Sequence, residues 1–306
     1  MRGAAYAGLA AIGLAWGASA PIIKTATGAG YAPLTVIFWQ SLLNVLVLGA
    51  ILAATGGLRR MPRTRPALAY YLVVGLFGMS LPHWASFSAT AHLPAGVMAL
   101  VISLVPIFAL PIALVRGHER FDPWRALGVG LGGLSMALLI APSTSLPAPG
   151  LWVWVLVGAL APFLYALEGT FVASLKTPPI DPFAALWAGA VVSVVVIAPL
   201  AWGAGQLVLP MALGPVEGMV ALSQGLSVLA YAGYLRLIRA TGPVFAAQVS
   251  YAVTAAGIGW SMLFLQERYS AWVWAAMALV FVALTVVQPR QGAKTGPSAG
   301  DPPIVT

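Results

Sequence analysis

The 306-residue chain is 60% hydrophobic and only 7% charged, whereas about 25% of the residues of a soluble domain are charged, so its composition excludes a soluble domain and indicates a membrane protein. The basic residues that give the chain its net charge of +8 lie between long apolar runs rather than on one face, which argues against a nucleic-acid partner. The chain has no cysteine, so disulfides, thiolate metal sites and cysteine nucleophiles are excluded.

Apolar runs of about 20 residues, enough to cross a bilayer as a helix, follow one another along the chain. The first run carries Trp16, Gly17 and Pro21 instead of a small-residue cleavage site, so it is interpreted as a helix and not a signal peptide. Residues 290–306 are polar and proline-rich, which predicts a disordered tail. The pattern predicts an all-α membrane protein with ten transmembrane helices, near 4–23, 34–54, 68–91, 95–115, 126–141, 151–173, 183–203, 214–235, 244–264 and 271–288.

The distribution of basic residues predicts the orientation of these spans. An even number of spans places both termini on one face. All of the 15 lysines and arginines except Lys24 and Arg268 then lie on the side of the N-terminus. The positive-inside rule therefore predicts that both termini, and the tail, are cytoplasmic.

The chain contains a short internal repeat that divides it into halves. The motif follows one long apolar run and precedes another in each half: Glu119-Arg120-Phe121 with Trp124, and Glu267-Arg268-Tyr269 with Trp272. Each unit contains five spans. Because five is an odd number, the two halves must cross the bilayer in opposite directions. This predicts two inverted five-helix repeats, residues 1–145 and 146–289, with a solute site near the midplane between them.

Several motifs resemble a known family. Residues 16–21, Trp-Gly-Ala-Ser-Ala-Pro, resemble the WG-x-x-x-P signature of EamA-type proteins of the drug/metabolite transporter superfamily. Residues 93–96, 103–106 and 117–121 are similar to the stretch from the third to the fifth span of that family. The resemblance implies a ten-helix bacterial inner-membrane transporter of small metabolites, commonly an exporter, with YddG-like amino acid exporters as the suspected branch. Two positions depart from the family pattern, Thr254 at the counterpart of Pro106 and Gln40 where many relatives have arginine.

Polar side chains inside the spans fall into stripes at helical spacing. Because polar groups in hydrocarbon are costly, such stripes should face the bundle interior or a wet cavity. Isolated serines and threonines commonly bond to backbone instead, whereas a glutamine needs several partners. A glycine run with Gly128 and Gly132 indicates close helix packing. The predicted substrate-binding residues are His83, Gln40, Asn44, Trp84, Ser86, Tyr165, Glu168, Gln224, Ser227, Tyr231, Gln248 and Tyr251.

Two of these residues are also candidates for proton coupling. His83 lies near the centre of the third span and can donate, accept or carry charge near neutral pH. The alternative is a neutral imidazole bonded to a neighbouring helix. Glu168 is the acid deepest inside a predicted span, but it could also extend to the cytoplasmic interface. Trp84 points about 100° away from His83, so at most one of the two faces a cavity squarely.

These features favour a solute transporter working by alternating access, with an amino acid or similar small metabolite as substrate. The alternatives are an exporter of drugs or lipophilic compounds and, less favoured because no loop is large, a membrane sensor or assembly subunit. No enzyme is predicted, because catalytic and metal-ligand constellations are absent from the spans, and no cofactor or metal is expected. The expected partners are a small-molecule substrate, the lipid bilayer and, as a candidate coupling ion, the proton; the oligomeric state is undetermined.

Overall fold

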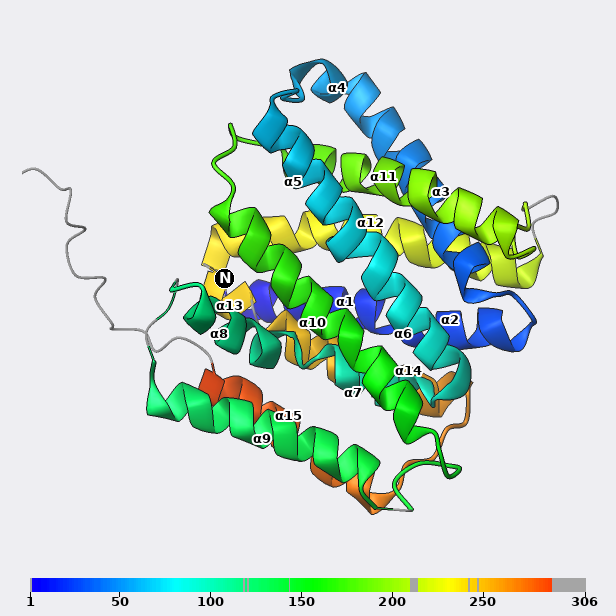
Figure 1. The fold of residues 1–306 in the computed structure, drawn as a ribbon, viewed down its shortest axis with the longest axis vertical. Coiled ribbons are helices and arrows are strands. Elements are labelled where there is room, and N and C mark those ends of the chain that lie inside the picture. The colour runs from blue at the N-terminus through cyan, green and yellow to red at the C-terminus, as the bar shows by residue number, and fades with distance from the viewer. Residues whose placement is uncertain are drawn as a thin grey trace, which may run out of the picture.

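The computed structural model describes residues 2–117, 119, 121–142, 144–209, 214–241, 243–246 and 248–287. Every regular element in these ranges is a helix, which confirms the all-α prediction (Figure 1). His118, Arg120 and the predicted tail at 290–306 lie outside the described residues.

The first half of the chain forms spans that are broken at several points. The first span divides at Ala18, the third contains a π-helical turn, and the fourth divides after Ile102. The elements are α1 (Arg2–Gly17), α2 (Ser19–Gly28), α3 (Pro33–Ala54), α4 (Gly57–Arg60), α5 (Arg65–Gly75), η1 (Leu76–Ser80), α6 (Leu81–His92), α7 (Ala95–Ile102), α8 (Val105–Val115) and α9 (Pro123–Ile140).

The second half has longer uninterrupted helices. They are α10 (Trp152–Ser174), α11 (Pro182–Gly203), α12 (Pro215–Thr241), α13 (Pro243–Ala246), α14 (Val249–Phe264) and α15 (Ala271–Val287). Eight helical stretches of the described chain are long and apolar enough to cross a membrane, which supports a multi-pass membrane protein. The two remaining apolar helices, α14 and α15, are shorter, so the count of ten spans stays a prediction.

Aspartates and prolines set where two of the helices begin. The Asp122 carboxylate accepts hydrogen bonds from the backbone N–H groups of Trp124 and Arg125 at the start of α9, and Asp181 caps α11 in the same way. Each aspartate is followed by a proline at the first helical position, where its missing N–H costs nothing. Both helix starts could therefore be located from the Asp-Pro pairs in the sequence.

Glycines permit the closest helix contacts. A Cβ at Gly128 would lie 2.5 Å from Val287 of α15, and one at Gly132 would lie 2.1 Å from Ile107 of α8. The expectation of close packing along this glycine face is confirmed. α9 and α15 run side by side at one edge of the molecule (Figure 1).

The most extensively packed helix pairs join one helix from residues 1–145 to one from residues 146–289. These pairs are α9 with α15, α3 with α11, α1 with α12 and α14, α5 with α11, α10 with α6 and α8, and α7 with α14. The two halves therefore interlock over most of their length. Their shared interior is formed by α1, α2, α3, α6, α7, α10, α12 and α14, and the candidate site lies there.

Candidate functional site

A cavity of about 280 Å³, named the polar cavity for the hydrogen-bonding side chains among its otherwise apolar walls, lies where the two halves of the chain meet. It is lined by side chains from α1, α2, α3, α6, α7, α10, α12 and α14. Six of the predicted substrate-binding residues are among its walls: Gln40, His83, Ser86, Tyr165, Gln224 and Ser227. None of the described lining residues is charged, so the cavity offers amide, hydroxyl, imidazole and indole groups.

His83 is held on one wall by the third span. Its ring stacks on Phe87 of the next turn, with centroids 5.1 Å apart. Its Nδ1 atom is buried, and no described residue offers it a hydrogen-bond partner. A buried polar atom without a partner is costly, so the hydrogen bonding of His83 is incomplete in this conformation. Trp84, the next residue, is 46% exposed on the outside of the bundle and does not line the cavity.

A second wall joins the two halves through an amide pair. The Nε2 group of Gln224 on α12 donates to Oδ1 of Asn44 on α3 at 2.7 Å. Gln40, one helical turn before Asn44, is itself a lining residue and is buried. Asn44 is not itself among the lining residues, and its bond to Gln224 restricts the position of that side chain in the wall.

Residues at the break in the first span also line the cavity, although they belong to none of the polar stripes. Trp16, Gly17, Ser19 and Ala20 all line the cavity. Pro21 has no N–H, so it cannot donate to the carbonyl of Gly17 four residues earlier. The same break interrupts the hydrogen-bond ladder between α1 and α2, so the N–H groups at the start of α2 lack the usual intrahelical partners. The signal that identifies these residues in the sequence is the Trp-Gly-x-x-x-Pro motif itself.

Glu168 lies outside this cavity, beside the π-helical turn of the third span. A Cβ at Gly78 would lie 3.0 Å from Oε1 of Glu168, so the glycine gives the carboxylate room. Tyr70, Tyr165 and Tyr231 lie within electrostatic range of the carboxylate. Tyr165 also lines the cavity, so this one phenol connects the cavity with Glu168.

The remaining predicted site residues lie elsewhere. Tyr231 packs edge-on against Phe183, with centroids 5.9 Å apart, and Tyr251 against Phe281 at 5.7 Å. Gln248 stands at the N-cap of α14. None of the three is among the residues that line the cavity. On α12 the far end of the polar stripe therefore faces another helix, whereas on α14 the predicted residues lie outside the cavity altogether.

The repeated Glu-Arg motif of the second half closes one end of the bundle. Glu267, in the loop after α14, accepts hydrogen bonds from the backbone N–H groups of Ala95 at 2.8 Å and Gly96 at 3.3 Å, at the start of α7. The Tyr269 hydroxyl donates to the same carboxylate and accepts from Gly96. Burial raises the pKa of Tyr269, so this hydroxyl stays protonated and remains a donor.

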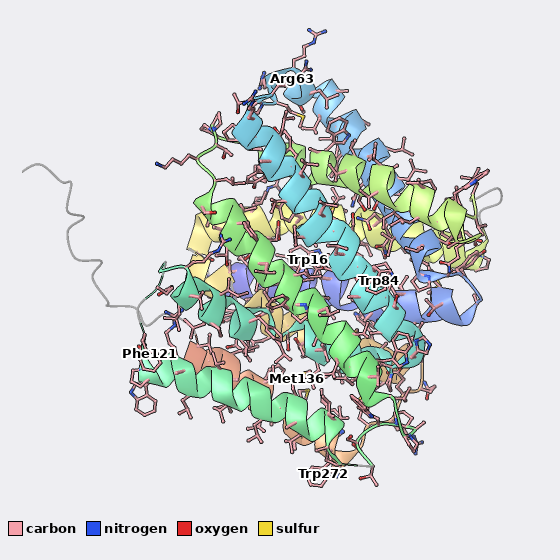
Figure 2. The ribbon with its side chains drawn as sticks, in the orientation of Figure 1. Trp16, Arg63, Trp84, Phe121, Met136 and Trp272 are labelled. Carbon is pink, nitrogen blue, oxygen red and sulfur yellow. The ribbon has the colours of Figure 1, made fainter. Side chains whose placement is uncertain are left out.

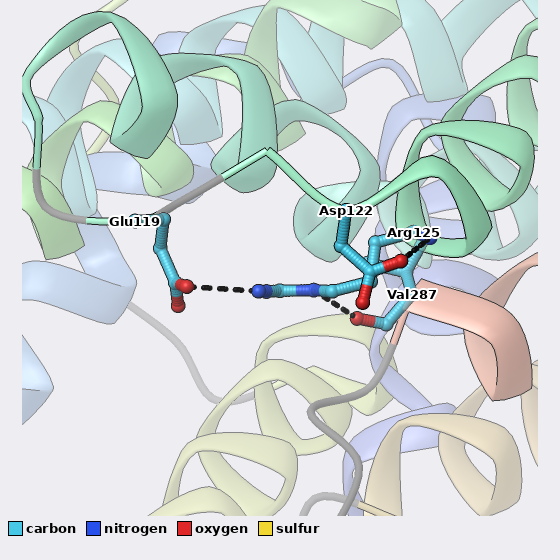
Figure 3. A network of polar contacts seen from close by, with 4 residues as sticks. All are labelled: Glu119, Asp122, Arg125 and Val287. Carbon is cyan, nitrogen blue, oxygen red and sulfur yellow. Dashed lines mark hydrogen bonds and ion pairs between the residues drawn. The ribbon is translucent and has the colours of Figure 1, made fainter. Parts of the chain in front are cut away.

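The matching motif of the first half is arranged differently. Glu119 is paired with Arg125 at 2.9 Å, and the Nε group of Arg125 donates to the carbonyl oxygen of Val287 at the end of α15 (Figure 3). Phe121, the counterpart of Tyr269, is 72% exposed and points away from the bundle (Figure 2). The residue six positions after the glutamate is Arg125 in the first half and Val273 in the second. The first glutamate therefore has a cationic partner for which the second half has no counterpart.

Comparisons with known proteins agree with this architecture. Residues 2–141 match the EamA-like transporter family. Two proteins named as the uncharacterized inner membrane transporter YedA, from Escherichia coli strain K12 and Escherichia coli O157:H7, are each 25% identical to this chain over 290 residues. Each match covers 92% of this chain and 90% of the relative. A solved crystal structure has the same fold, with a TM-score of 0.63 at 21% identity over 97% of this chain and 99% of that chain. Residues 2–141 therefore carry an EamA-like transporter domain, as the motifs of the sequence predicted.

Proposed function

We propose that this protein is a multi-pass transporter of the bacterial inner membrane that moves a small amino-acid-like solute by alternating access. The observation that carries the proposal is the polar cavity between the two halves, with His83, Gln40 and Gln224 in its wall. A cavity shared by two halves of a membrane bundle is the site that alternating access requires. The inner-membrane location of the YedA relatives supports the same cell membrane for this chain.

The chemistry of the walls favours a neutral or zwitterionic solute. Without a charged lining residue in the described chain, a solute with a net charge would lose its hydration uncompensated. A zwitterion is better served, because the amide and hydroxyl side chains of the wall can accept from an ammonium group and donate to a carboxylate. Trp16 and Phe87 provide surface for an apolar side chain. An amino acid combines these three parts.

The helix packing supports two inverted repeats, residues 1–145 and 146–289. The proposal that both termini are cytoplasmic rests on the distribution of the basic residues. If each span of one half corresponds to the span five places later, α3 packs on its own counterpart α11, and α9 on its counterpart α15. In the same scheme α1 packs on α12 and α14 as its counterpart α10 packs on α6 and α7. Such reciprocal pairing is what a two-fold relation between halves produces. Epitope labels on the two termini should both be reached from the cytoplasmic face, and labels on opposite faces would contradict the scheme.

The two Glu-Arg motifs provide a means of alternation. Glu267 fastens the loop after α14 to the start of α7, at the face predicted to be external. At the other face Glu119 is engaged by Arg125 and half-exposed. We infer that the described conformation is closed at the external end, and that Glu119 binds the start of the ninth span in the opposite conformation while Glu267 is released. Each glutamate thus acts as a gate residue for one face.

Replacing His83 by leucine should reduce transport strongly, whereas the same change at Trp84 should not. Leucine fills much of the space of the imidazole but offers no hydrogen bond. The solute therefore loses an interaction of about 1–3 kcal/mol, equivalent to about a 5- to 150-fold loss of uptake. Trp84 is the neighbouring residue but faces outward, so Trp84→Leu should retain uptake within about twofold. The measurement is counterflow of radiolabelled amino acids into proteoliposomes, with thermal unfolding confirming that each variant is folded.

The same assay separates the alternatives. Folded wild-type protein that accumulates no amino acid would remove the substrate proposal, and accumulation of a lipophilic compound instead would favour the drug exporter. Equal loss in both leucine variants would show that His83 does not act through the cavity. An imposed pH gradient that leaves uptake unchanged would exclude proton coupling by His83 or Glu168.

A further inference from the structure

A second and larger cavity lies apart from the polar site, as a groove of about 980 Å³ between α1 and α12. On α1 the walls are small residues at helical spacing, Ala4, Gly8, Ala11 and Ala15. On α12 they are Leu226, Leu229, Gly233 and Leu237, again on one helix face. A Cβ at Gly8 would meet no atom within 4 Å, and Leu229 is 69% exposed. The groove is therefore an open apolar channel on the outside of the bundle.

The length of the groove matches one leaflet of a bilayer. It follows α1 from Ala4 to Ala15, which at 1.5 Å per residue spans about 16 Å. The hydrocarbon core of a bilayer is about 30 Å thick, so the groove extends from the membrane surface to about the midplane. A groove of that length accommodates the acyl chains of a lipid in one leaflet.

One charged side chain stands at the surface end of the groove. Arg236 is the charged residue among the lining side chains, and it is exposed. It lies on the side of the chain's N-terminus, near the edge-on ring pair of Tyr6 and Phe245. In the described part of the chain no carboxylate lies within ion-pair distance of Arg236. A guanidinium without an acidic partner at the mouth of an apolar channel is suited to a phosphate that carries an acyl chain.

We propose that this groove binds one anionic phospholipid of the leaflet on the side of the N-terminus. An acyl chain lies along Gly8, Ala11 and Leu229, and the lipid phosphate is held by Arg236 through paired N–H donors. The site requires only that the protein is embedded in a membrane, so it does not depend on what the polar cavity carries. Anionic headgroups are favoured over zwitterionic ones, because their net negative charge is not offset by an ammonium group next to the arginine.

Two substitutions probe the headgroup and the chain separately. The purified full-length protein is delipidated in detergent and titrated with phosphatidylglycerol or phosphatidylethanolamine, and bound lipid is counted by native mass spectrometry. Wild type should retain phosphatidylglycerol in preference. Arg236→Gln should weaken phosphatidylglycerol binding about 10-fold or more and abolish the preference, because a charge-assisted contact is lost. Gly8→Phe should fill the channel and reduce binding of both lipids.

Matched controls keep the test decisive. Arg59→Gln removes an exposed basic residue outside the groove, and Gly130→Phe adds a ring on an open surface of α9, where a Cβ would meet no atom within 4 Å. Both should bind lipid as wild type does. If Gly8→Phe does not fold, Ala11→Phe serves in its place. Equal retention of the two lipids by wild type, or an unchanged affinity in Arg236→Gln, would overturn the proposal. It would also be overturned if the wild-type protein is a dimer and Gly8→Phe dissociates that dimer without changing the amount of bound lipid, because the groove would then bind a second copy of the chain.

Discussion

Glu267→Gln should open the external face of the protein. The carboxylate accepts hydrogen bonds from two backbone N–H groups at the start of α7, and charge-assisted bonds of this kind contribute about 1.5–3 kcal/mol each. The neutral amide of glutamine can accept only one of these two hydrogen bonds, and that bond is weaker. The closed conformation should therefore lose about 3 kcal/mol of stability, equivalent to roughly a 100-fold rise in the externally open population. The expected result is a variant that is folded but fails to stay closed at that face.

The absence of cysteine makes this change directly measurable. A single reporter, Ser227→Cys, places a thiol in the wall of the polar cavity. An impermeant maleimide added to the external face should label the reporter roughly 100-fold faster in Glu267→Gln than in the reporter alone. The matched control is Glu119→Gln, which should not raise labelling from that face, because Glu119 lies at the other end of the bundle.

The opposite gate has its own expected outcome in the same assay. Arg125→Gln releases Glu119 from the ion pair shown in Figure 3. Glu119 should then bind the start of the ninth span more often, so labelling from the cytoplasmic face should slow. A Glu267→Gln protein that labels at the rate of the reporter alone would refute the gate, while leaving the polar cavity as a binding site untouched.

Gly17→Ala should destabilise the whole bundle although it adds a single methyl group. The new Cβ would lie 2.7 Å from Ala256 Cβ, 2.8 Å from the backbone nitrogen of Gly257 and 2.9 Å from the carbonyl oxygen of Val253. Two of these atoms belong to the backbone of α14 and cannot rotate away, so α1 and α14 must separate. Overpacking of this kind costs about 1–3 kcal/mol, and the midpoint of thermal unfolding should fall by about 2–10 °C.

Gly8→Ala, on the same helix, is the control for this prediction. Its Cβ would meet nothing within 4 Å, and alanine is the better helix former, so the midpoint should stay the same or rise slightly. The comparison removes any effect of backbone flexibility in α1. Equal midpoints for wild type and Gly17→Ala would show that α1 and α14 are not packed as described.

Much of the candidate site was foreseeable from helical spacing. His83 and Ser86, three residues apart on α6, line the cavity together, and Gln224 and Ser227 do so on α12. In hydrocarbon a polar side chain has few acceptable surroundings, so a polar stripe on an apolar helix identifies the inward face. What spacing could not indicate is how far along each stripe the cavity reaches. Tyr231 continues the stripe of Gln224 but packs against Phe183.

The sequence by itself determined the membrane class, the helical fold and the inward faces of the helices, because an apolar solvent forces each span to satisfy its own backbone and to turn its polar groups inward. Only the tertiary structure decided that Asn44 supports Gln224 and that Trp16 reaches the cavity while Glu168 lies beside it. It also decided that Glu267 binds the start of α7, whereas Glu119 is paired with Arg125. These contacts join residues far apart in the chain. Periodicity along one helix defines a face, but the neighbour that the face meets depends on how all the helices pack together.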